Sequence, residues 1–207
     1  MINGHDIARM PFRTYVIDKS AMIRGIIEDA INGGANVRFG ITAVKCATKN
    51  GGYECLVHDK DGGEYVINAK TLIGADAYPS IVDLSLGITR GGFRAEDLII
   101  ATSARARGGG YVDDEAVIIM DPGGVAPGGF AWIFPRGGDG SHNIGVGVRN
   151  NIAWRGGNPI DYHALFVSRY GLESARRSVL MKTLPVGGLL NKYGTGNAYL
   201  IGDAVAQ

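Results

Sequence analysis

Two short apolar runs end in a glycine and an aspartate. Residues 72–76 have the sequence Leu-Ile-Gly-Ala-Asp, and residues 200–204 have the sequence Leu-Ile-Gly-Asp-Ala. A glycine at a strand end lets a ligand approach the backbone closely, and a carboxylate there lies where open α/β sheets bind ligands. Either aspartate could instead cap a following helix, a contribution of about 1 kcal/mol. Two such ends together favour a ligand site, and its candidate residues are Gly74, Asp76, Gly202, Asp203 and Ala204.

A second candidate site is the aromatic stretch 130–135, Phe-Ala-Trp-Ile-Phe-Pro. Trp132 and Phe134 alternate with Ile133, so both side chains lie on one face of a strand. Two aromatic side chains on one sheet face form an apolar wall for a hydrocarbon chain, but the same pattern also fits an ordinary core. Gly145 and Gly147 alternate as well and leave room on one sheet face for a ligand or an overlying ring.

The histidines, serines and arginines form no recognisable catalytic or metal-binding pattern. The 4 histidines are dispersed without metal-binding spacing, and His142, which follows a glycine-rich turn, is expected in a solvated loop. No serine stands in a nucleophile context, so we assign neither a catalytic residue nor a metal. Arg105 and Arg107 alternate on a strand. They either meet an anionic head group or form an outward-facing charged edge.

The composition narrows the function classes. A formal net charge of +1 gives no electrostatic argument for nucleic-acid binding. The chain is 45% hydrophobic and 20% charged, which is typical of a globular protein with a core. No apolar run has membrane-spanning length, which leaves peripheral membrane association open. Cys46 and Cys55 have neither zinc nor Cys-x-x-Cys spacing, so we expect two free buried thiols in a reduced, cytoplasmic protein.

The elements that position these residues follow from periodicity and turn signals. A helix is expected after Asp18 or Ser20, either of which can cap it, and it should end at Gly33. Its apolar residues recur at helical spacing and predict one buried face, made of Met22, Ile23, Ile26, Ile27, Ala30 and Ile31. Strands are expected at 12–17, 35–39, 41–47, 53–58, 65–69 and 71–76. Turns at 50–52 and 61–62 join the middle strands into an antiparallel meander.

The second half of the chain is mostly strands. They are expected at 98–107, 116–120, 129–135, 142–149, 179–184 and 199–201, with a helix at 159–170. The fold class is therefore mixed α/β (α+β): a Rossmann-like layer with the two Gly-Asp strand ends, plus an antiparallel sheet. The expected domains are 1–90, 91–184 and 185–207, the last returning to the first.

In order along the chain, these motifs resemble the geranylgeranyl reductase family of flavoproteins, which has the flavoprotein hydroxylase fold. Residues 73–76 with Ser80 are similar to the Gly-Ala-Asp-Gly-x-x-Ser motif of that fold, and residues 202–204 to its second flavin motif. Residues 130–135, followed by Gly145 and Gly147, resemble the aromatic-Pro…Gly-x-Gly signature, which is the most specific of the matches. This sequence departs from the family pattern at Ala77, Asp83 and Phe130.

The resemblance implies particular ligands. FAD would contact Gly202 and Asp203 near its ribityl-phosphate region and Asp76 on the phosphate side. An isoprenoid chain would lie against Trp132, Phe134, Pro135, Gly145 and Gly147. The family's N-terminal Gly-x-Gly-x-x-Gly turn and the helix after the second Gly-Asp do not occur in the sequence. We therefore expect a partial chain that binds FAD poorly and is inactive by itself.

The implied function is an FAD-dependent reductase of isoprenoid (geranylgeranyl) double bonds in a lipid or a prenyl side chain. The electron donor would be a ferredoxin or NADPH, and the protein would be cytoplasmic, with peripheral attachment to the membrane left open. Two alternatives remain. One is an FAD-dependent aromatic hydroxylase or halogenase, and the other is a non-catalytic lipid-binding protein that kept the apolar sheet.

Overall fold

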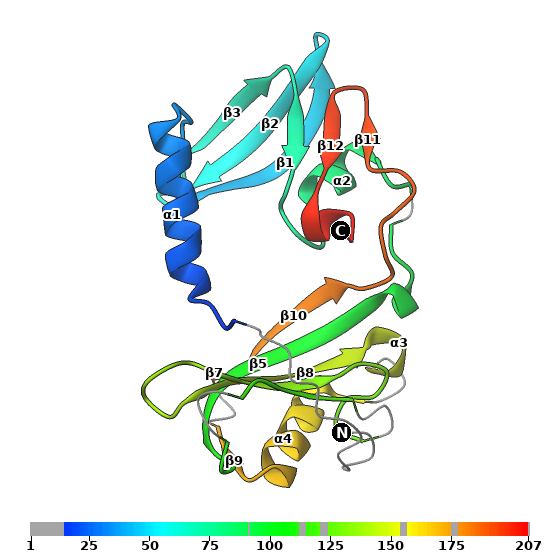
Figure 1. The fold of residues 1–207 in the computed structure, drawn as a ribbon. Helices are drawn as coiled ribbons and strands as arrows, with labels where there is room; N and C mark the ends of the chain where they lie inside the picture. The colour runs from blue at the N-terminus through cyan, green and yellow to red at the C-terminus, as the bar shows by residue number, and fades with distance from the viewer. Residues whose placement is uncertain are drawn as a thin grey trace. The chain divides into compact units, whose positions relative to one another are not determined.

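The computed structural model describes residues 15–90, 92–111, 115–120, 124–153, 157–174 and 178–206 (Figure 1). They fall into two compact units. Unit 1 contains residues 93–187, and unit 2 contains residues 17–92 together with the segment from residue 188 onward. The mixed α/β fold class expected from the sequence is confirmed, because helices, antiparallel sheets and a parallel strand pair all occur.

Unit 2 begins with helix α1, Lys19–Asn32. Asp18 caps it as predicted, since its Oδ1 accepts from the Ala21 N–H at 3.0 Å, and the helix ends at Gly33. The predicted burial of its apolar face is wrong. No residue of α1 is buried, and Ile26 is 58% exposed. Periodicity predicts which face of a helix is apolar, but not whether another element covers that face.

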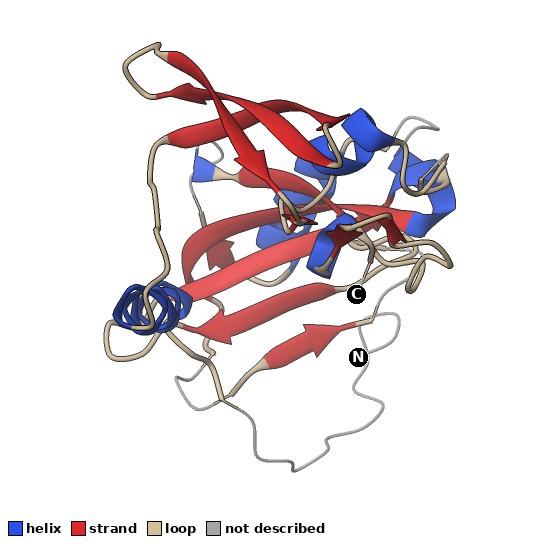
Figure 2. Ribbon diagram, turned by 90° about the horizontal axis from the view of Figure 1, so that it is seen from above, coloured by secondary structure: helices blue, strands red, loops and turns tan. Residues whose placement is uncertain are grey.

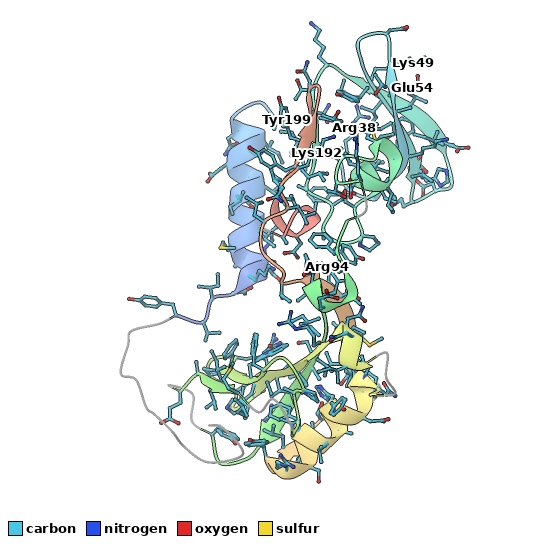
Figure 3. All side chains as sticks on the ribbon, turned by 90° about the vertical axis from the view of Figure 1, so that its right-hand side faces the viewer. Arg38, Lys49, Glu54, Arg94, Lys192 and Tyr199 are labelled. Carbon is cyan, nitrogen blue, oxygen red and sulfur yellow. A yellow bond between two sulfur atoms is a disulfide. The ribbon has the colours of Figure 1, made fainter. Side chains whose placement is uncertain are left out.

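A three-stranded antiparallel meander follows, made of β1 (Ile41–Lys49), β2 (Gly52–Asp59) and β3 (Glu64–Ala69). Both predicted hairpin turns form. Asn50 and Gly51 have positive φ at the first, where Lys49 and Glu54 pair across the strands (Figure 3). At the second, Asp59 Oδ1 accepts from the Gly63 N–H at 2.8 Å. The prediction of a strand at 35–39 is wrong. The prediction of a strand at 12–17 is wrong for residues 15–17, and residues 12–14 lie outside the described part.

The prediction of free cysteines is also wrong. Cys46 and Cys55 are direct partners across β1 and β2, with their Cα atoms 4.2 Å apart, and they form a disulfide. Both cysteines are buried in the core of unit 2. The two residues lie symmetrically about the Asn50–Gly51 turn, so the hairpin brings them opposite one another. The equal distance of the two cysteines from the turn could have predicted the disulfide from the sequence, whereas the spacing rules for metal sites do not consider it.

The remaining sheet of unit 2 has the order β11–β12–β4, from β11 (Gly194–Thr195), β12 (Ala198–Leu200) and β4 (Leu72–Gly74). Strands β12 and β4 are parallel. Helix α2 (Ile81–Leu86) follows β4, and the 3-10 turn Gly202–Ala204 follows β12. Tyr53 ties the meander to this sheet, because its hydroxyl donates to Thr195 O and accepts from the Asn197 N–H.

Unit 1 is built around an antiparallel sheet (Figures 1 and 2). The strand order in this sheet is β10–β5–β8–β7–β6. The strands are β5 (Leu98–Gly108), β6 (Val117–Ile119), β7 (Ala131–Pro135), β8 (His142–Arg149) and β10 (Leu180–Pro185), with the short β9 (Leu172–Glu173) paired to β5. A short 3-10 turn, Ala95–Asp97, precedes β5, and helix α3 (Asn150–Ala153) follows β8.

Helix α4 (Pro159–Arg169) packs against β5 and β8 and covers one face of this sheet. The predicted helix at 159–170 is therefore confirmed. The core between α4 and the sheet contains Phe166 with the side chains of alternate strand residues, among them Ile133, Ile144, Val146 and Val148, all fully buried. Within the described ranges no helix is long and apolar enough to cross a lipid bilayer.

Candidate functional site

The two Gly-Asp strand ends lie side by side. Leu200 pairs with Gly74 in the parallel β12–β4 ladder, and the Ile201 N–H donates to Gly74 O at 2.9 Å. Both motifs therefore reach the same carboxyl edge of one sheet, which is where α/β proteins place ligand sites. The sequence indicated two similar strand ends, and the structure shows that they are neighbours.

The two motifs differ in what their aspartates do. Asp76 accepts hydrogen bonds from Ser80 Oγ at 2.7 Å and from the Ile81 N–H at 2.6 Å, at the start of α2. Gly74 is required for packing, because a Cβ there would lie 2.8 Å from Leu200 Cδ2. The first motif therefore shows the helix-capping alternative, in which the carboxylate is satisfied inside the chain.

The second motif is open. Gly202 has φ +62°, and no atom lies within 4 Å of the place where its Cβ would be. In the described part of the chain the Asp203 carboxylate has no hydrogen-bond partner, and its side chain is half-buried. Ala204 is buried in the core and anchors the turn. Gly202 and Asp203 are thus the positions at this edge where a ligand can approach the backbone and find an available acceptor.

The second candidate site is the face of the unit 1 sheet opposite α4, which we call the open face. It is defined by the alternate strand residues that point away from α4: Ile118, Trp132, Phe134, Asn143, Gly145, Gly147, Arg149, Ile99, Ala101, Ser103, Arg105, Arg107, Leu180, Lys182 and Leu184. Trp132 and Phe134 share this face, as expected, and their ring centroids are 6.5 Å apart. The Phe130 ring lies 5.9 Å from the Trp132 ring, which extends the aromatic row.

The Trp132 indole lies across the neighbouring strand. Gly145 is its direct cross-strand partner, and a Cβ at residue 145 would overlap the indole ring. The indole Nε1–H donates to Asn143 Oδ1 at 2.7 Å, and Asn143 Nδ2 donates to Ser103 Oγ at 3.1 Å. Of the two uses expected for Gly145, the overlying ring is the one observed.

Sequence reasoning missed Asn143 and Ser103, although both are polar residues on otherwise apolar strands. It also grouped Pro135 with the wall. The structure places the Pro135 side chain on the opposite, buried face with Ala131 and Ile133, because it is one residue out of phase with Phe134. Gly147 lies beside Ile99, whose Cδ1 would be 3.1 Å from an added Cβ.

Two histidines are buried on the core side of the sheet, away from the open face. The expectation that His142 is solvated is wrong, because it begins β8 between Pro135 and Ala106 and is 2% exposed. His163 of α4 lies 3.0 Å from Thr102 Oγ1, which itself donates to Val146 O. The hydroxyl proton is therefore already used, so His163 Nδ1 must carry the proton in this contact. Burial lowers the pKa of His163.

A charged cluster stands at one end of the open face. Arg105 Nε donates to Ser141 Oγ at 3.0 Å, and Arg105 Nη2 donates to Asp139 Oδ2. Arg107 Nη2 lies 3.6 Å from the same oxygen. Hydrogen bonds from Ser141 hold the pKa of Asp139 below its ordinary value, and the charges of the two arginines add to this effect. The Asp139 carboxylate therefore forms ion pairs with both guanidinium groups.

Comparisons with known proteins show which proteins this chain resembles. Residues 100–186 match the family model described as "Geranylgeranyl reductase catalytic domain". A digeranylgeranylglycerophospholipid reductase of Methanosarcina acetivorans is 30% identical over 195 residues, which cover 93% of this chain and 47% of that protein. The resemblance to geranylgeranyl reductases expected from the sequence is therefore confirmed. The chain spans about half the length of the curated relatives it matches.

Solved structures show the same fold. A geranylgeranyl bacteriochlorophyll reductase-like protein from Thermoplasma acidophilum superposes with a TM-score of 0.77 at 21% identity, over 93% of this chain and 48% of that chain. An aklavinone-11 hydroxylase, solved with FAD and aklavinone, superposes with a TM-score of 0.59 at 18% identity, over 90% of this chain and 36% of that chain. At these identities the likeness shows the flavoprotein fold alone.

Proposed function

We propose that this chain, which is similar to the geranylgeranyl reductases, is part of an FAD-dependent oxidoreductase that reduces carbon–carbon double bonds of an isoprenoid chain. The observation that carries the proposal is the open face, whose aromatic row lies within residues 100–186. The same residues match the geranylgeranyl reductase catalytic domain. The relatives' name, digeranylgeranylglycerophospholipid reductase, indicates the substrate class.

The open face fits a long hydrocarbon chain. The aromatic row is flanked by exposed apolar side chains, including Ile118 at 50% and Leu180 at 75% exposure. Burying hydrocarbon stabilises a complex by about 0.8 kcal/mol per CH₂, so several isoprene units could bind without a polar contact. The hydrogen bonds from Trp132 to Asn143 and from Asn143 to Ser103 fix the plane of the indole. The aromatic wall therefore stays flat, and no conformational entropy is lost in ordering this ring when a ligand binds. An isoprenoid on this face also excludes water from the reacting bond.

The cofactor site proposed is the carboxyl edge of β4 and β12. Gly202 and Asp203 fit FAD, because the space at Gly202 is open and the Asp203 carboxylate is free to accept hydrogen bonds from ribityl hydroxyls. Asp76 would act indirectly by holding α2 at the same edge. When bound and reduced, FAD supplies a hydride to the double bond. Its electrons would come from a ferredoxin or NADPH, and a protein attached peripherally to the membrane would meet such lipids.

The test is an anaerobic assay of the purified full-length protein of which this chain is part, reduced with dithionite and supplied with FAD and a geranylgeranylated lipid. Mass spectrometry should show two hydrogens gained per reduced double bond. Trp132→Ala should raise KM for the lipid, because it removes the centre of the wall. Tyr65→Ala, in β3 of the other unit, is the control and should leave KM unchanged. An unchanged lipid with fully flavin-loaded protein would contradict the proposal.

An FAD-dependent hydroxylase or halogenase is the second candidate, favoured by the fold shared with aklavinone-11 hydroxylase. Such enzymes need oxygen at the reduced flavin, whereas an isoprenoid reductase needs a dry apolar surface. Oxygen-dependent hydroxylation of an aromatic substrate, together with no loss of isoprenoid double bonds, would favour this candidate. Tight isoprenoid binding without any redox chemistry would favour the non-catalytic lipid carrier.

A further inference from the structure

We infer that Arg105 and Arg107 bind the phosphate of the lipid head group, at the end of the open face on which the isoprenoid chain lies. This inference rests on the proposed function, and it adds the residues that would recognise the charged part of the substrate. Apolar contacts with the aromatic wall do not fix the position of an isoprenoid along the wall, so they do not select which double bond is reduced. A head group bound at one end of the face would fix that position.

The position of the arginines supports the inference. Ser103, Arg105 and Arg107 alternate along β5, so they point to the same face at successive steps of about 7 Å. Ser103 lies in the row that contains Gly145 and Trp132, and Arg105 lies one row further, opposite Asn143. A lipid lying along β5 would thus place its chain against Trp132 and its head group against the arginines.

The charge balance at this end is favourable for an anion. Asp139 is shared by the two guanidinium groups, and Glu173, the cross-strand partner of Arg107, forms no ion pair with either of them among the described residues. The two arginines therefore have one carboxylate between them within ion-pair distance. Both side chains are accessible, at 56% for Arg105 and 62% for Arg107. Guanidinium groups bind phosphate through paired N–H donors, and these two are already oriented by Asp139 and Ser141. The cost of ordering them on binding is therefore small.

The other end of the open face is different. There Arg149 Nη1 donates to Glu96 O at 2.6 Å and its Nε donates to Gly128 O at 3.3 Å, so this guanidinium holds backbone segments together. The Arg105 end is therefore the better place for a head group. A surface ion-pair network without a ligand is the competing explanation, and such exposed pairs contribute little to stability.

The test compares equilibrium binding of geranylgeranyl monophosphate, geranylgeraniol and inorganic phosphate to the full-length protein, without reductant. Arg105→Gln and Arg107→Gln should each weaken binding of the lipid phosphate by about ten-fold or more, since a charge-assisted hydrogen bond is lost. Binding of the neutral alcohol should not change. The loss should shrink as salt is raised. Inorganic phosphate should bind far more weakly than the lipid phosphate.

Arg94→Gln is the matched control, because Arg94 also forms an exposed pair with a carboxylate, Asp97, just before the other end of β5 (Figure 3). It should leave binding of both lipids unchanged, and thermal unfolding should show that all three variants fold. Equal losses for the alcohol and the phosphate, or no loss for either, would overturn the inference. Inorganic phosphate that binds as tightly as the lipid phosphate would also overturn it. Because no turnover is measured, a failure of the reductase proposal would be seen separately.

Discussion

The indole of Trp132 lies over the backbone of Gly145, its direct partner on the neighbouring strand. This contact explains why a wide aromatic ring lies across the sheet instead of standing up from it. The absence of a side chain at residue 145 provides the space, and Asn143 fixes the ring through its Nε1–H. The smooth wall proposed for the isoprenoid therefore depends on a glycine as much as on the aromatic residues.

Gly145→Ala should destabilise the protein by about 1–3 kcal/mol, since its Cβ would meet both the indole and the backbone oxygen of Thr102, which cannot move aside easily. Denaturant unfolding measures the loss. In a Trp154→Phe background, tryptophan emission should also report the displaced ring. Gly147→Ala is the control, because its Cβ would meet only the flexible end of Ile99 at 3.1 Å and a more distant backbone oxygen. Equal effects of the two substitutions would contradict this account.

The two aspartates at the carboxyl edge should behave differently. Asp76→Ala should lower the free energy of unfolding by about 0.5–2 kcal/mol, because it removes the acceptor at the start of α2. Asp203→Ala should leave the free energy of unfolding within about 0.5 kcal/mol and, in the full-length protein, weaken FAD binding, as measured by flavin fluorescence quenching. If Asp203→Ala destabilised the fold as much as Asp76→Ala did, its role as an open acceptor would be wrong.

The Cys46–Cys55 disulfide should stabilise the protein. Closing a loop of about ten residues contributes about 2–3 kcal/mol through the unfolded chain. Thiol titration of unfolded, unreduced protein should find no free thiol, and reduction should lower the unfolding midpoint. A Cys46→Ala, Cys55→Ala double variant should show the lowered midpoint with or without reductant. Two reactive thiols in protein purified without reductant would contradict the disulfide.

The stability should fall as pH falls below about 6.5, the ordinary pKa of histidine. Burial lowers the pKa of His163 in the folded protein, so the unfolded chain takes up a proton first. The stabilisation by neutral His163 is fully present above the histidine pKa of the unfolded chain. As the pH falls toward the lower pKa of the folded protein, this stabilisation decreases by at most about 1.4 kcal/mol per pH unit. His163→Gln should flatten this dependence. His58→Gln, at an exposed position beside Glu64, is the control and should preserve it.

Much of the fold followed from local signals. The strand at 142–149 was predicted with both ends correct, and Asp18 and Gly33 marked the ends of α1. These predictions succeed because caps, turns and strand alternation act within a few residues. Burial of the apolar face of α1 failed as a prediction, because it depends on what packs against the helix.

The site could be predicted only in part. Alternation was enough to place Trp132 and Phe134 on one face, and it also places Pro135 on the other, which the motif-based grouping overlooked. The capping role of Asp76 could not be separated from that of Asp203, because the two strand ends look alike until the bonds to Ser80 and Ile81 are seen. The buried state of His142 depends on long-range pairing with Ala106, which no local pattern reveals.

The reductase proposal is decided by the fate of the isoprenoid double bonds when the flavin-loaded, reduced full-length protein meets a geranylgeranylated lipid, with and without oxygen. We expect hydrogens to be added to the lipid under anaerobic conditions, and we expect oxygen to slow this reaction by consuming the reduced flavin. A lipid that keeps all its double bonds under both conditions, while an aromatic compound is hydroxylated in the presence of oxygen, would contradict the proposal.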